Sequence, residues 1–192
     1  MTQWGMNMTR HNVFISYHHA NDQTYKEKFV QYFQNCFIDK SVHMGEYAED
    51  LSTEYVKRLI REEKITNSSV IVVLVGAETY KRKHVDWEIS AGLSCMAGGY
   101  SGLIGILLPS YYTSIENYAL LPNQYFPATL PPRLLDNVKT GFASLYTWNN
   151  LFMRDSHGYP ILCSWLDMAF NKKYTHSHLI NNSRLQYANN RA

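Results

Sequence analysis

The sequence predicts an α/β domain with a parallel sheet of about five strands and helices on both of its faces. Apolar segments rich in Val and Ile alternate with segments in which apolar residues recur at helical spacing. Residues 69–75 contain six consecutive apolar residues without alternation, which is typical of a strand buried on both faces. In such sheets ligands bind beyond the carboxyl ends of the strands, so residues 16–22, 76–88 and 109–130 are the candidate binding segments.

The elements are expected in the following order. The first part contains a strand at 11–17, a helix capped by Asn21 or Asp22 and reaching about Cys36, a short strand near 41–44, and a helix at about 51–63. The second part contains a strand at 69–75, a polar loop at 76–84, a helix carrying Ile89, Leu93 and Met96, a strand at 103–108, an irregular tyrosine-rich segment at 109–130, a strand at 143–148, and a final helix at 160–173.

These elements divide the chain into three parts. Residues 1–10 form an N-terminal extension, residues 11–173 form the domain, and residues 174–192 form a polar tail that we expect to fray.

Composition argues for a packed globule. The chain has 192 residues, of which 45% are hydrophobic and 18% charged, and its net charge is +2. The longest basic cluster is residues 81–83, which does not indicate a nucleic-acid partner. The first ten residues lack the apolar region of a signal peptide, and no apolar run approaches the roughly 20 residues of a membrane span. We therefore expect a cytoplasmic protein that binds no membrane.

The cysteines indicate neither a disulfide framework nor a CxxC metal site. Cys36, Cys95 and Cys163 are odd in number and lie far apart within apolar, helix-like segments. The sequence therefore predicts reduced, buried thiols. His84, Asp86 and Glu88 offer ligand atoms at alternate positions, but these cross from a loop into a helix and do not share one side. We expect no metal.

Several nucleotide-binding and catalytic motifs are absent. The sequence has no P-loop, no GxGxxG after the first strand and no GxSxG elbow. The strand at 69–75 ends in Gly76 rather than in the aspartate of a receiver domain. The acidic residues Asp86 and Glu88 open the third helix at the expected binding edge. Two interpretations stay open for them, namely acids that complement the helix dipole, or a carboxylate directed into a pocket.

Two segments make the sequence similar to a known family. Val13-Phe-Ile-Ser-Tyr17, followed by His18, His19 and Asp22, resembles the first motif of TIR domains. His84-Val-Asp-Trp-Glu-Ile-Ser-Ala91 resembles the segment in which enzymatic TIR domains carry their catalytic glutamate. The resemblance extends over about residues 11–108, and it is most specific to the TIR-like subunit of the bacterial Thoeris antiphage system. It implies a flavodoxin-like (TIR-type) sheet.

The resemblance also implies a function. Such proteins convert NAD, their substrate rather than a cofactor, into a cyclic ADP-ribose isomer that activates a partner effector. Glu88 takes the catalytic position, and Ser16, Tyr17 and His18 are the expected contacts to ribose or pyrophosphate. A phage-derived trigger and a homo-oligomer are further expectations from the resemblance.

The sequence departs from the family pattern in places. His84 stands where an aromatic residue is usual, although Trp87 is near enough to supply a ring, and residues 39–50 lack the Arg-Asp…Pro-Gly pattern of receptor-type domains. The tyrosine-rich segment 109–130 is a candidate lid. Two other functions remain open. One is a non-catalytic TIR-like interaction module, and the other is a nucleoside deoxyribosyltransferase-like enzyme.

Overall fold

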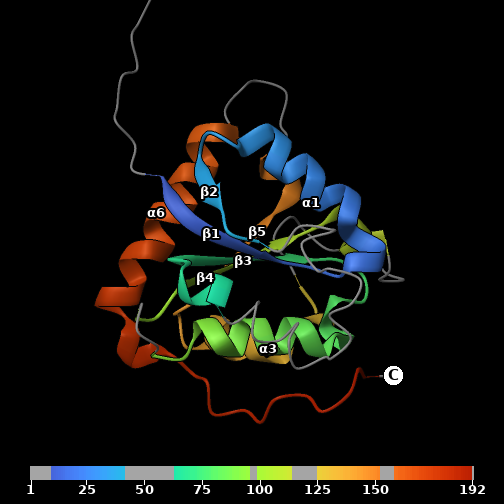
Figure 1. Cartoon of the computed structure of the whole chain (residues 1–192). Coiled ribbons are helices and arrows are strands. Elements are labelled where there is room, and N and C mark those ends of the chain that lie inside the picture. Colours follow the sequence, from blue (N-terminus) through green and yellow to red (C-terminus); the bar gives the residue numbers. More distant parts are fainter. Residues whose placement is uncertain (1–9, 42–62, 96–98, 114–124, 152–157, 192) are drawn as a thin grey trace, which may run out of the picture.

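The computed structural model describes residues 10–41, 63–95, 99–113, 125–151 and 158–191. Its centre is one five-stranded, all-parallel sheet with the strand order β2-β1-β3-β4-β5, which is the flavodoxin-like order (Figure 1). The predicted fold class is therefore confirmed. The strands are β1 (His11–Ser16), β2 (Phe37–Asp39), β3 (Val70–Val75), β4 (Gly102–Leu107) and β5 (Ser144–Thr147).

Helices cover both faces of the sheet. They are α1 (His19–Phe33), α3 (Lys83–Gly92), the short α4 (Pro109–Thr113), α5 (Pro132–Lys139) and α6 (Gly158–Thr175). Figure 1 shows α1 and α6 on one side of the sheet and α3 on the other. Two buried apolar clusters correspond to these sides, one containing Phe29 of α1 and Leu166 of α6, the other containing Ile89 of α3 and Leu134 of α5.

Strand β3 is buried on both faces, as its uninterrupted apolar sequence predicts. Val70, Val72 and Leu74 contribute to the cluster beneath α1 and α6, whereas the alternating residues Ile71 and Val73 contribute to the cluster beneath α3. Because successive side chains of a strand point to opposite faces, one six-residue segment supplies the centre of both cores.

Several boundaries differ from the sequence-based expectation. Helix α1 begins at His19 and its N-cap is His18, not Asn21 or Asp22, because the His18 ring accepts from the amide of Asn21. The second strand lies at Phe37–Asp39, before the predicted 41–44. Helix α5 was not predicted at all. Of the predicted helix at 51–63, all but the last residue lies outside the described residues.

The tyrosine-rich segment is described only at its two ends. Tyr111 is a core residue whose hydroxyl contacts Thr129 Oγ1 at 2.8 Å and accepts from the amide of Phe126 at 3.0 Å. The rest of the candidate lid, residues 114–124, lies outside the described ranges. In the parts of the chain that the structure covers, no helix combines the length and apolar character needed to cross a membrane.

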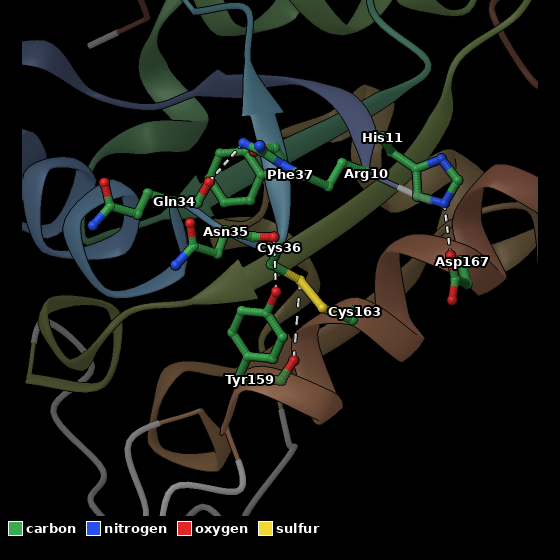
Figure 2. Close-up of a disulfide and its surroundings, with 9 residues drawn as sticks. All are labelled: Arg10, His11, Gln34, Asn35, Cys36, Phe37, Tyr159, Cys163 and Asp167. Carbon is green, nitrogen blue, oxygen red and sulfur yellow. Dashed lines mark hydrogen bonds and ion pairs between the residues drawn. A yellow bond between two sulfur atoms is a disulfide. The ribbon is translucent and has the colours of Figure 1, made fainter. Parts of the chain in front are cut away.

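The prediction of reduced, buried thiols was wrong in one respect for each of the three cysteines. Cys36, just before β2, and Cys163, on α6, form a disulfide with a Cα–Cα distance of 5.8 Å (Figure 2). The fold brings these residues together across 127 positions, a proximity that local spacing does not reveal. Cys95 is a free cysteine and is exposed rather than buried.

The C-terminal tail is packed rather than frayed. Helix α6 extends to Thr175, and the chain then runs back along the side of α3 that faces away from the sheet (Figure 1). Residues 181–191, here called the C-terminal strap, form hydrogen bonds with both α3 and α5. Polar composition alone suggested a frayed tail, but these polar groups are paired with helix residues that the sequence does not place beside them.

Candidate functional site

The carboxyl ends of β1, β3 and β4 meet at one edge of the sheet. The strand order reverses direction between β1 and β3, and this switch point is where doubly wound sheets bind ligands. Ser16 is the last residue of β1, and α3 follows β3 at the same edge after a short 3₁₀ turn at Thr79–Lys81.

A buried serine–glutamate pair joins the end of β1 to α3. The hydroxyl of Ser16 donates to Oε2 of Glu88 across 2.6 Å, and Glu88 is only 4% exposed. Ser16 points to the α3 side because it lies two residues after Phe14, which packs in the core cluster on that side. The structure thus brings together two residues, 72 positions apart, that the sequence predicted as catalytic and substrate-binding.

Glu88 lies in the second turn of α3, not in the first turn as predicted. The helix begins at Lys83, so Asp86 is the acidic residue of the first turn. Because the influence of the helix dipole falls off within the first turn, it contributes less to the environment of Glu88 than the sequence suggested. The bond from Ser16 orients the carboxylate instead.

Tyr17 and His18 diverge from the Ser16–Glu88 pair. Tyr17 lies on the opposite face of the sheet, with its ring stacked on His19 and its hydroxyl bonded to Gln23. His18 caps α1 through Nδ1, so the neutral ring carries its proton on Nε2. That nitrogen is buried and has no hydrogen-bond partner among the described residues. Burial, with a smaller contribution from Arg82, holds the pKa of His18 below its usual 6.5.

His84 and Trp87 lie on the first two turns of α3, next to each other. Their ring centroids are 5.2 Å apart in an edge-to-face arrangement, and His84 precedes Glu88 by one helical turn. The indole nitrogen of Trp87 donates to the carbonyl of Tyr187 at 2.8 Å. Trp87 is therefore directed toward the C-terminal strap, while His84 is on the flank of α3 nearer to Glu88.

A second buried acid at this edge was missed as a site residue. Asp22, on α1, is 1% exposed and accepts hydrogen bonds from Ser110 (3.2 Å) and Thr79 (3.5 Å). Burial raises the pKa of Asp22, and the two hydroxyl donors act against that shift. Its carboxylate occupies the space that a side chain at Gly76 would fill. The sequence did carry a signal for this cluster, because its polar residues follow the ends of β1, β3 and β4.

Asp86 and Arg133 form a fully buried ion pair on the outer side of α3. Nε and Nη2 of Arg133 donate to the two carboxylate oxygens of Asp86 at 2.9 and 3.3 Å. Asp86 is thus paired with a cation on α5. This pairing explains the acidic residue at position 86 more specifically than an interaction with the helix dipole does. No cluster of three or more potential metal ligands occurs among the residues that the structure covers.

Comparison with known families shows to which family the chain belongs. Residues 14–112, just over half of the chain, match the family described as Thoeris protein ThsB, TIR-like domain. The chain belongs to this family. No curated protein matches the sequence significantly.

The match to the Thoeris TIR-like family confirms the resemblance found in the sequence. It covers Ser16, Asp22 and Glu88 together with the second half of β1 and the whole of β3 and β4. Helix α5, strand β5, helix α6 and the C-terminal strap lie beyond the matched residues. Arg133, the partner of Asp86, is therefore outside the part of the chain that defines membership of this Thoeris family.

Proposed function

We propose that this Thoeris TIR-like protein is an enzyme that cleaves the nicotinamide–ribose bond of NAD. The product is a cyclic ADP-ribose isomer that activates a partner effector in antiphage defence. The observation that supports the proposal most directly is the buried Ser16–Glu88 pair at the switch point of the sheet. Family membership supports a role in Thoeris defence.

The chemistry of NAD cleavage suits an oriented carboxylate. Breaking the N-glycosidic bond develops positive charge on the ribose, as glycoside hydrolysis does. Nicotinamide leaves as a neutral molecule from a cationic pyridinium, so the reaction needs no general acid. A carboxylate fixed beside the ribose lowers the barrier by stabilising the charge that develops there.

Burial of Glu88 has two consequences for this mechanism. Its interaction with the developing charge is stronger than it would be in water, because the surroundings have a low dielectric constant. Substrate binding must also displace the side chains that cover the carboxylate. Exclusion of water favours cyclisation, since a hydroxyl of the same molecule competes with water at about 55 M for the ribosyl cation.

Ser16 has a supporting role in the proposal. Its hydroxyl fixes the rotamer of Glu88 from a rigid strand, which is the kind of support a catalytic group requires. His18 Nε2–H, which has no partner in the described ranges, is a candidate donor to an oxygen of the substrate. His84, one turn before Glu88, remains a candidate contact for the nicotinamide or ribose.

The test is nicotinamide release from NAD by the purified protein, with products resolved by chromatography and mass spectrometry. Glu88→Gln removes the charge and keeps the shape, so turnover should fall by about 100-fold or more. Glu27→Gln makes the same change on an exposed face of α1 and is the matched control. A lysate from phage-infected cells supplies a trigger if one is required.

The outcomes separate the candidate functions. A product one water lighter than ADP-ribose identifies a cyclase, and ADP-ribose itself identifies a hydrolase. Turnover of nucleosides without NAD cleavage would favour the deoxyribosyltransferase-like alternative. A folded protein that releases no nicotinamide, with or without the lysate, would contradict the proposal and favour the interaction module.

A further inference from the structure

The C-terminal strap contacts one face of α3. Its partners on that helix recur at three- and four-residue spacing and lie opposite Val85 and Ile89, which face the sheet. They are Lys83, Asp86, Trp87 and Ser90, and Ser94, just after the end of the helix, continues the series. Helix α3 is therefore held between the sheet and the strap, and Figure 1 shows the strap running along its outer side.

The strap caps the beginning of α3. The N-cap residue, Arg82, makes no side-chain capping bond. Instead, Oδ1 of Asn190 accepts from the amide of Lys83 at 3.0 Å, and the amide of Arg191 donates to the carbonyl of Lys81 at 2.9 Å. A free amide at a helix start is normally satisfied by a nearby Ser, Thr, Asp or Asn. Here the cap comes from a residue 107 positions away.

Tyr187 connects the strap to two successive residues of α3. Its amide donates to Oδ2 of Asp86 at 3.0 Å, and its carbonyl accepts from Nε1 of Trp87 at 2.8 Å. The other hydrogen-bond partner of Asp86 is Arg133. The remaining N–H groups of Arg133 donate to Oδ1 of Asn182 and to the carbonyls of Asn182 and Arg184. The carboxylate of Asp86 thus lies at the junction of α3, α5 and the strap.

These contacts fall on the two turns that carry Glu88. The bond from Ser16 to Glu88 spans the gap between a strand and a helix, so a small rotation or shift of α3 changes it. We propose that the C-terminal strap, together with the Asp86–Arg133 pair, positions α3 so that Glu88 meets the substrate. This inference rests on the proposed NAD-cleaving function, and it makes Asp86, Arg133 and Asn190 positioning residues rather than catalytic ones.

The experiment compares two variants with a matched control. Asn190→Ala removes the cap. Deletion of residues 188–192 removes the last part of the strap but keeps Asn182, a hydrogen-bond partner of Arg133. Arg184→Ala is the control, because its side chain lies on the same strap and, within the described part of the chain, bonds to Asp136 of α5 rather than to α3. Hydrogen–deuterium exchange of residues 83–92 reports on α3, and exchange of residues 70–75 reports on the sheet.

Both strap variants should exchange faster at 83–92 and keep the protection of β3. We expect kcat for nicotinamide release to fall by about 10- to 100-fold, since misplacing a catalytic group by about 1 Å costs that much. KM should change little, and the control should resemble the wild type. In a Glu88→Gln background the strap changes should have little further effect, because they act through the same carboxylate.

Three results would overturn the inference. One is unchanged exchange at 83–92 in both strap variants. Another is an unchanged kcat in an active protein, and the third is a fall in kcat that is equally large in the Glu88→Gln background. If the wild type releases no nicotinamide, the proposed function fails by itself. Exchange at α3 then decides alone whether the strap holds the helix.

Discussion

Replacing Arg133 should destabilise the protein more than replacing any exposed charge. The side chain is 0% exposed, and all five of its N–H groups have acceptors, two on Asp86 and three on the strap. In Arg133→Met the aliphatic part is retained, but Asp86, which is 2% exposed, loses the cation that neutralises it. Breaking a buried ion pair in this way costs about 3–5 kcal/mol.

Urea denaturation followed by circular dichroism measures this cost. With an m-value of about 2 kcal/mol/M, a loss of 3–5 kcal/mol lowers the midpoint by about 1.5–2.5 M. The double variant Arg133→Met/Asp86→Leu leaves no unpaired charge, so it should be more stable than Arg133→Met alone. Arg184→Ala breaks a partly exposed pair with Asp136 and should cost about 1 kcal/mol or less.

Two results would refute this reasoning. If Arg133→Met lowers the midpoint no more than Arg184→Ala does, the buried pair contributes little to stability. If the double variant is less stable than Arg133→Met, the cost comes from lost packing or lost strap contacts rather than from an unpaired carboxylate.

Two further predictions concern buried acids and thiols. Because burial raises the pKa of Asp22 above 3.8, the folded chain keeps a proton that the unfolded chain has released, and stability falls as pH rises from 3.8 through the raised pKa. In Asp22→Asn the melting temperature should depend less on pH over that window. A pH dependence as steep as that of the wild type would contradict the argument. The Cys36–Cys163 disulfide joins residues 127 apart, so reduction should remove up to about 5 kcal/mol of stability. Under native, non-reducing conditions a thiol-alkylating reagent should label Cys95 alone, and labelling of all three cysteines would disprove the pairing.

The sheet was predictable because its information is local. The β3 sequence is apolar at every position from Val70 to Val75, and only a strand covered on both faces buries all of them. The placement of the candidate site residues was predictable too, although the catalytic role expected for Glu88 came from the family resemblance. Ser16 ends a strand and Glu88 lies on the helix that follows β3, so topology alone places them at one edge.

The missed features depend on contacts between distant parts of the chain. Helix α5 has only eight residues and follows Pro131, and the largest of its fully buried side chains is a charged one, Arg133. An arginine in a sequence indicates an exposed position unless its partners are known, and the partners of Arg133 are Asp86 and the strap. For the same reason the disulfide was missed and the three-residue strand β2 was predicted a few residues too late, since neither has a recognisable local pattern.

The residues that define the family are not sufficient to build its site. A chain ending at residue 112 would retain Ser16, Asp22 and Glu88, but it would lack β5 and leave the long, apolar β4 as an open edge. It would also expose the outer face of α3 and leave Asp86 without its cation. The matched segment therefore contains the proposed catalytic carboxylate of Glu88, whereas the contacts that hold α3 on its outer side come from α5 and from the C-terminal strap.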